Sequence, residues 1–164
     1  MTLRLLLPAL VFAAFTLPAT AQNLVKWGEA GGWDVLVDPS VGNGCLIASE
    51  FEDGSVVRVG IDAEKDEGYV MAFNAAWGDI VEGETYPISF DLDGEEYEGE
   101  ALGVWLDNTP GIEIAFDSEE FIMDLALKNT MTLSHDGEVV MAIDLSGSFA
   151  GLEQAIACQE AQGN

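Results

Sequence analysis

Apolar and polar residues alternate with a period of two over much of this chain, as in strands with one buried and one solvated face. Turn signals separate the alternating segments. The strongest are three Asp-Gly pairs, whose residues accept the positive φ angles of tight hairpin turns: Asp53-Gly54, Asp93-Gly94 and Asp136-Gly137. The sequence therefore predicts three β-hairpins centred on these pairs.

Nine strands are expected in all: 33–37, 45–51, 57–61, 69–73, 86–92, 96–105, 112–116, 131–133 and 139–145. Their close spacing, with turn residues between them, favours hairpin connections over the long crossovers of a parallel sheet. The predicted fold is mainly β, an antiparallel β-sandwich or a partly closed barrel of about nine strands.

The second hairpin has one strongly acidic strand. Glu96, Glu98 and Glu100 share one face of it and must face water, whereas the opposite face, which ends at Trp105, is expected to point inward. Pro87 lies in the strand before the turn and has no backbone N–H. That strand is therefore expected to be an edge strand or to begin at Pro87.

Two segments have helical periodicity instead. Asp117 and Glu120 form a capping-box pattern before a short internal helix that is expected to stop near Asn129. Ser148 is expected to cap a C-terminal helix, and residues 159–164 are expected to form a frayed tail. The apolar stripe predicted for that helix consists of Phe149, Leu152, Ala155 and Ile156.

The N-terminus has the pattern of a secretory signal peptide. Arg4 precedes an apolar run at 5–15, and Ala19-Thr20-Ala21 is a small-x-small cleavage site before Gln22. The run is too short to span a membrane, which needs about 20 apolar residues. We expect cleavage between Ala21 and Gln22, a signal peptide at 1–21, a single exported domain at 22–164 without membrane insertion, and a periplasmic or secreted location.

Cys45 and Cys158 are the two cysteines of the chain. Disulfides persist outside the cytoplasm, so we expect these residues to pair and to tie the beginning of the fold to its end. A redox or metal-binding role is the alternative, but the chain has no Cys-x-x-Cys motif and no histidine near either cysteine in sequence.

The formal net charge is −25 at pH 7. Nucleic acids and anionic membranes both require clustered cations, so neither is an expected partner. The charge has two interpretations: it attracts a basic partner, or it keeps an exported monomer soluble in a salty or acidic environment.

Catalytic patterns are sparse. His135 is the single histidine, it directly precedes a predicted turn, and no Gly-x-Ser-x-Gly motif accompanies it. The acidic runs that start at Asp62 and Asp91 lack the glycine and the final glutamate of an EF-hand loop. We expect His135 to be a solvated turn residue, and we expect neither an enzyme nor a bound metal or cofactor.

Trp27 and Trp77 lie outside the alternating pattern, whereas Trp33 shares a face with predicted core residues. Exposed tryptophans stack on sugar rings in carbohydrate-binding domains. A carbohydrate-binding module that uses Trp27 and Trp77 is therefore an alternative function.

Three segments resemble small exported alphaproteobacterial proteins of the invasion-associated locus B type: Trp33-Asp34-Val35-Leu36-Val37, Gly44-Cys45 and 143–152, which reads Ile-Asp-Leu-Ser-Gly-Ser-Phe-Ala-Gly-Leu. The chain departs from that family after Trp33, where a further cysteine is expected, and it carries Cys158 in the final helix instead. The resemblance implies a periplasmic or surface β-rich domain with a part in host or envelope interaction, and it implies no catalytic residue.

These observations together predict a non-enzymatic exported β-domain. It is expected to bind a basic protein or an envelope component through an acidic face at Glu96, Glu98 and Glu100.

Overall fold

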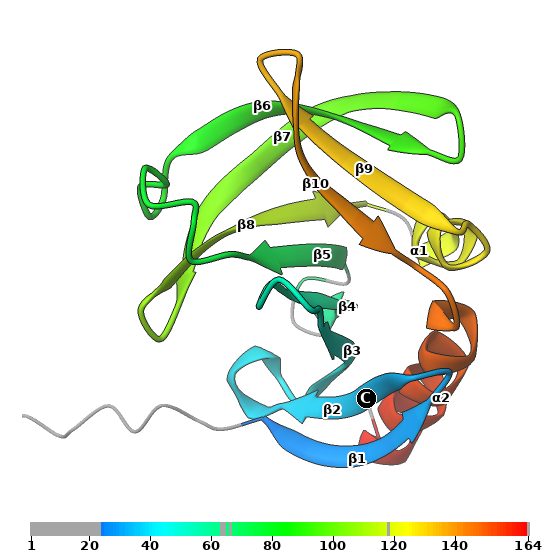
Figure 1. Cartoon of the computed structure of the whole chain (residues 1–164). Coiled ribbons are helices and arrows are strands. Elements are labelled where there is room, and N and C mark those ends of the chain that lie inside the picture. Colours follow the sequence, from blue (N-terminus) through cyan, green and yellow to red (C-terminus); the bar gives the residue numbers. More distant parts are fainter. Residues whose placement is uncertain (1–23, 63–64, 66, 118, 164) are drawn as a thin grey trace, which may run out of the picture.

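The computed structural model describes residues 24–62, 65, 67–117 and 119–163, in which ten antiparallel strands form one open sheet beside two α-helices (Figure 1). The predicted mainly β fold is confirmed. The predicted cleavage site between Ala21 and Gln22 lies outside the described residues.

The strands are β1 (Val25–Ala30), β2 (Trp33–Asp38), β3 (Gly44–Glu50), β4 (Val56–Asp62), β5 (Glu67–Phe73), β6 (Thr85–Leu92), β7 (Glu95–Leu106), β8 (Thr109–Phe116), β9 (Thr130–His135) and β10 (Glu138–Asp144). A short 3₁₀ turn, Pro39–Val41, follows β2, and the helices are α1 (Glu119–Ala126) and α2 (Ser148–Gln162).

The sheet order is β1-β2-β3-β4-β5-β8-β7-β6-β9-β10. All neighbouring strands are antiparallel, and β1 and β10 form the two edges. Figure 1 shows that the sheet curls, so that β6, β7 and β9 lie above β5 and β8 in that view. The interior of the curl and the inner faces of the helices enclose the hydrophobic core, which includes Val35, Ile47, Leu133, Ile143 and Leu152.

The tenth strand, β1, is absent from the sequence prediction. It pairs with β2 through a two-residue turn at Gly31 and Gly32, both with positive φ, and Ala30 lies opposite Trp33. Gly-Gly is a hairpin signal as well as Asp-Gly. The prediction missed it because the segment before the turn is largely exposed and shows little apolar alternation.

All three predicted hairpins are present. The β6–β7 and β9–β10 turns are tight, with Asp93 and Asp136 at positive φ before their glycines. The β3–β4 turn is wider: Glu50 pairs with Val56, and the Asp53 carboxylate accepts a hydrogen bond from the Ser55 backbone at 3.0 Å.

Two expectations about the second hairpin are wrong. β6 lies between β7 and β9 and is not an edge strand, although its pairing with β9 begins only at Ser89. Pro87 lies before the part of β6 that pairs with β9, so its missing N–H removes no hydrogen bond to β9. Trp105 is 42% exposed, because the end of β7 pairs with Pro110 at the tip of the β7–β8 hairpin, away from the core.

Helix α1 forms where the sequence predicts a short helix, and it ends at Ala126. The predicted capping box of Asp117 and Glu120 involves the Glu120 side chain, which lies outside the described part. The expected cap of α2 is wrong. Its N-cap residue is Gly147, and the buried Ser148 hydroxyl donates a hydrogen bond to the Ala126 carbonyl at 3.3 Å. Tertiary contact with α1 has replaced local capping.

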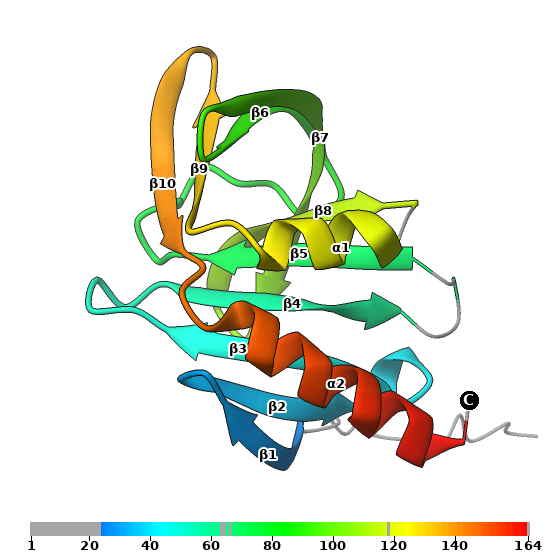
Figure 2. The ribbon, with the colours of Figure 1, turned by 90° about the vertical axis from the view of Figure 1, so that its right-hand side faces the viewer.

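Helix α2 lies across β2 and β3 (Figure 2) and continues to Gln162, so the frayed tail expected from Gln159 onward is wrong. Its buried face consists of Ser148, Gly151, Leu152, Ala155 and Cys158, whereas Phe149 and Ile156 of the predicted stripe are exposed.

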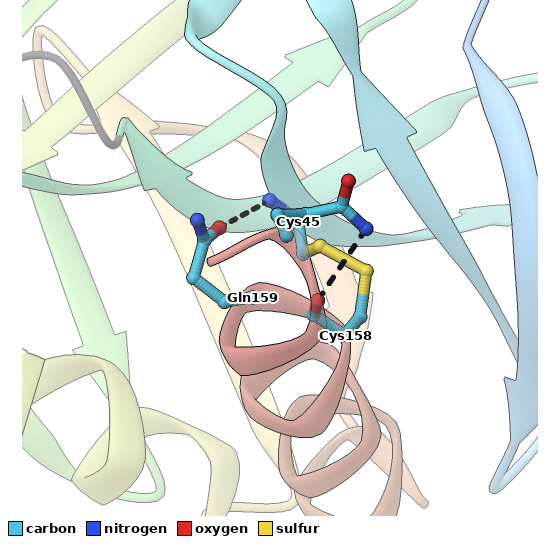
Figure 3. The surroundings of a disulfide bond; sticks show 4 residues. Cys45, Cys158 and Gln159 are labelled. Carbon is cyan, nitrogen blue, oxygen red and sulfur yellow. Dashed lines mark hydrogen bonds between the residues drawn. A yellow bond between two sulfur atoms is a disulfide. The ribbon is translucent and has the colours of Figure 1, made fainter. Parts of the chain in front are cut away.

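A disulfide joins Cys45 on β3 to Cys158 on α2, as the sequence predicts (Figure 3). Both cysteines are buried, and their Cα atoms are 6.1 Å apart. The Gln159 side chain reinforces the junction, because its Oε1 accepts a hydrogen bond from the Cys45 backbone N–H at 2.8 Å. The last helix is thereby fixed to the third strand.

Candidate functional site

The acidic row, which we define as Glu96, Glu98 and Glu100, lies on the outer face of β7. All three residues are exposed, whereas Tyr97 between them is half-buried and Ala101 is buried. A strand rises about 3.3 Å per residue, so neighbouring carboxylates of the row originate about 7 Å apart. The predicted alternation on β7 is thus observed as far as Gly103.

Strand β6 adds to the negative charge of this face. Asp91 pairs directly with Glu96, while Ser89 and Pro87 pair with Glu98 and Glu100. Like charges directly opposite each other on a sheet repel. The outer face of the β6–β7 hairpin therefore carries unfavourable electrostatic energy that a cation would relieve.

Within the described residues, no ion pair is found for the acidic row. The nearby Lys128 contacts Glu95 instead, with 2.6 Å between Nζ and Oε2, and this hydrogen bond and charge lower the pKa of the Glu95 carboxyl. Glu95 starts β7 and belongs to the alternate set of side chains. Lys128, which lies between α1 and β9, thus pairs with the start of β7 and not with the row.

A shallow acidic groove of about 570 Å³ lies beside the row and is lined by Glu98, Glu100, Pro87, Ser89 and Asp136. Asp136 belongs to the β9–β10 turn, and the pairing of β9 with β6 brings that turn to this face. Sequence reasoning missed Asp136 as a site residue. Its position depends on a strand pairing that no local pattern indicates.

A second hollow, the Trp77 cavity, has a volume of about 310 Å³ and a mostly apolar lining. The loop between β5 and β6 supplies Trp77, Asp79 and Ile80. Strand residues complete the wall: Tyr86 and Ile88 from β6, Ile112 from β8, His135 from β9 and Val140 from β10. Residues far apart in sequence therefore form one concave surface.

Hydrogen bonds fix the polar side of this cavity. The Tyr86 hydroxyl accepts a bond from the Val81 backbone N–H at 2.8 Å, which anchors the loop to β6. His135 Nδ1 lies 2.7 Å from the Pro87 carbonyl oxygen, and because a carbonyl only accepts, Nδ1 carries the proton. The His135 ring also meets the Tyr86 ring edge to face, with 6.0 Å between ring centroids.

His135 is therefore more than the solvated turn residue that the sequence suggests. It ends β9, its side chain is 37% exposed, and its Nε2 lies 3.5 Å from an Asp136 carboxylate oxygen. It stands between the Trp77 cavity, which it lines, and the acidic groove, which its neighbour Asp136 lines.

The structure does not place Trp27 and Trp77 in one site. Trp27 is 42% exposed on the edge strand β1 and does not line the Trp77 cavity. Trp77 is half-buried and packs against the core. Of the predicted pair, Trp77 lines a hollow that also contains Tyr86 and His135.

In the described part of the chain, carboxylates of the second acidic run accept hydrogen bonds that stabilise the β6–β7 turn and attach it to the start of β9. Asp91 accepts from the Gly94 backbone, and Asp93 accepts from the Asn129 side chain and the Asn129 and Thr130 backbones. These bonds lower the pKa of Asp93. Among the described residues, no group of three or more histidine, cysteine or acidic side chains is arranged to hold a metal ion.

None of the described helices is long and apolar enough to cross a membrane.

No protein-family model matches this chain, and no curated protein has a significantly similar sequence. A search of solved structures finds the crystal structure of invasion associated protein B from Bartonella henselae, with a TM-score of 0.57 and 12% sequence identity. The match covers 80% of this chain and 96% of the other. At the level of the fold, the chain is thus similar to an invasion-associated protein B, as the sequence segments suggest.

Proposed function

We propose that this protein is a non-enzymatic, exported binding domain that recognises a basic polypeptide through the acidic row and groove. The observation that carries the proposal is a solvent-facing row of carboxylates on the β6–β7 hairpin, where Lys128 pairs with Glu95 and not with the row. The signal-peptide pattern, the disulfide and the likeness to an invasion-associated protein support export.

The geometry suits lysine and arginine side chains. Carboxylates about 7 Å apart match the spacing of every second residue along an extended peptide, which alternates its side chains in the same way. Such complementarity raises the association rate and selects partners by charge, and it weakens as salt screens it.

The test compares two triple variants that remove the same number of charges. One replaces the row by Glu96→Gln, Glu98→Gln and Glu100→Gln. The matched control neutralises three exposed carboxylates on other elements, Glu52, Glu153 and Glu160. Binding of a labelled lysine-rich peptide is measured by fluorescence anisotropy at low and high salt.

The row variant is expected to bind the peptide at least about tenfold more weakly than the control variant, a difference of roughly 1.4 kcal/mol. Equal weakening of both variants would show that the net charge attracts the peptide without a defined surface, and it would contradict the proposal.

The alternative function is carbohydrate binding in the Trp77 cavity. It is favoured by one observation, the presence of Trp77 and Tyr86 in the same wall. Glycans are titrated against intrinsic tryptophan fluorescence of the wild type, Trp77→Phe and Trp27→Phe. A sugar site requires quenching that disappears in Trp77→Phe and persists in Trp27→Phe, and the same quenching in both variants would exclude it.

A further inference from the structure

Strand β10 is an open edge of the sheet. It pairs with β9 on one side, and none of the strands in the described residues pairs with it on the other. Its successive residues Val139 and Val140 are 67% and 42% exposed. A long edge with exposed apolar residues invites pairing with another extended chain.

The two edges of the sheet differ in their protection. Natural edge strands commonly carry lysine or proline, which discourages strand pairing. Strand β1 carries Lys26, which forms ion pairs with Glu29 and Asp34. Strand β10 has neither residue type, and its charged residues stand only at its ends, Glu138 and Asp144.

A β-bulge gives the β10 edge a second feature. The register shifts between Val139 and Met141, so Val140 is the extra residue and lines the Trp77 cavity. Bulges commonly re-aim a side chain near a functional site. The open edge and the apolar hollow are therefore neighbours. At about 310 Å³, the hollow is at the lower end of the range for small ligands and suits one large apolar side chain.

Negative charge surrounds this edge. Asp79 lines the cavity, Asp136 lines the acidic groove at the hairpin tip, and Glu138 begins β10. Ile88 lines both hollows, so the cavity and the groove lie against the same strand, β6. Neither lining includes a lysine or arginine. Charge complementarity thus selects a basic occupant and disfavours a second copy of this acidic chain.

We propose that the edge of β10 and the Trp77 cavity bind an extended segment of a basic polypeptide by strand addition. The segment pairs its backbone with β10, inserts one apolar or aromatic side chain into the cavity, and presents flanking lysine or arginine side chains to Asp79, Asp136 and Glu138. Backbone bonds supply affinity in such complexes, and the pocket supplies specificity. This inference rests on the proposed function, since it assigns the binding mode of the same basic partner.

The probe is a labelled peptide in which lysines flank a central phenylalanine within alternating valines. Its control has the same sequence with every second backbone nitrogen methylated, which removes the donors of one peptide edge and keeps the charge. Val140→Lys blocks the cavity and protects the edge. Val25→Lys, at an exposed valine of β1, adds the same charge to the other edge and is the matched variant.

Strand addition requires that Val140→Lys weaken binding at least about tenfold relative to Val25→Lys. It also requires that the methylated peptide bind at least about tenfold more weakly than the unmethylated peptide. Backbone amides within Met141–Asp144 should also gain protection from hydrogen exchange when the peptide binds. Equal affinities for Val140→Lys and Val25→Lys, or for the two peptides, would overturn the inference.

The row variant with three glutamines separates the two proposals. If it weakens binding while the Val140→Lys substitution and methylation do not, the acidic row binds the peptide and strand addition is wrong. If neither the row variant nor Val140→Lys weakens binding, both proposals fail. A chain that self-associates through β10 in light scattering, with dissociation caused by Val140→Lys, would identify a second copy as the occupant and overturn the inference.

Discussion

Removal of the disulfide should cost about as much stability as the most destabilising substitutions of single core side chains. Cys45 and Cys158 are 113 residues apart in sequence, so the crosslink closes most of the folded chain into one loop. In the chain-entropy model, a loop of this length lowers the free energy of the folded state relative to the unfolded state by about 5 kcal/mol. Most of this stabilisation comes from the lower conformational entropy of the crosslinked unfolded chain.

The double variant Cys45→Ala and Cys158→Ala tests this magnitude without leaving reactive thiols. For about 140 ordered residues, an unfolding entropy of roughly 0.3 kcal/mol/K converts the loss to a fall in Tm of about 16 °C. Urea unfolding followed by circular dichroism gives the free energy independently. The m-value should rise, because an uncrosslinked chain exposes more surface when it unfolds.

Near-UV circular dichroism at low temperature is the control for native structure. Its tryptophan and tyrosine bands should match those of the wild type, since Leu152 and Ala155 still pack α2 against the sheet. A decrease in Tm of less than about 5 °C, with an unchanged m-value, would refute the entropic reasoning. It would show that the α2 contacts alone restrain the chain end.

Three further predictions concern stability. Gly31→Ala should destabilise the fold by at least about 3 kcal/mol, because the new Cβ would lie 2.1 Å from the Gly147 carbonyl oxygen and the residue has a positive φ. Gly32 has a similar φ but open space around it, so Gly32→Ala should cost only about 1–2 kcal/mol, as measured by thermal unfolding. Asp93→Asn should lower Tm at neutral pH, because hydrogen bonds from Asn129 to the Asp93 carboxylate hold its pKa below the ordinary value. The difference in Tm between variant and wild type should disappear as the pH falls through the folded-state pKa of Asp93, and a difference that stays constant with pH would contradict this cause. Moderate salt should raise the Tm of the wild type by screening repulsion among carboxylates, and an unchanged or lower Tm would mean that the charges are already compensated.

The sequence predicts the hairpins well because their determinants are local. An aspartate and a glycine with positive φ occupy the β6–β7 and β9–β10 turns, and this residue pair is a local signal for a tight hairpin. The same reasoning fails for Ser148, whose residue type suits a helix cap. Its hydroxyl instead satisfies the Ala126 carbonyl of another helix, a tertiary partner that the sequence does not reveal.

Only part of the candidate site could be predicted. The exposure of Glu96, Glu98 and Glu100 follows from alternation along one strand. The proximity of His135 and Asp136 to that strand follows from the pairing of β6 with β9, where Ser89 lies opposite Ser134. That pairing skips two strands and a helix in sequence, so the groove and the cavity emerge only in three dimensions.

Alternation on β7 separates binding from folding. The acidic row points outward while Ala101, on the other face of the same strand, is fully buried. Neutralising the row removes repulsion and leaves the core untouched, so the variant with three glutamines should unfold at the same or a slightly higher temperature than the wild type. The control variant at Glu52, Glu153 and Glu160 tests whether the negative charge serves solubility in general or a defined binding surface. If the acidic residues serve only solubility, the Tm of the two variants should rise by the same amount relative to the wild type. A larger gain for the row variant, together with its loss of peptide binding, would show that this face retains repulsion that its binding function requires.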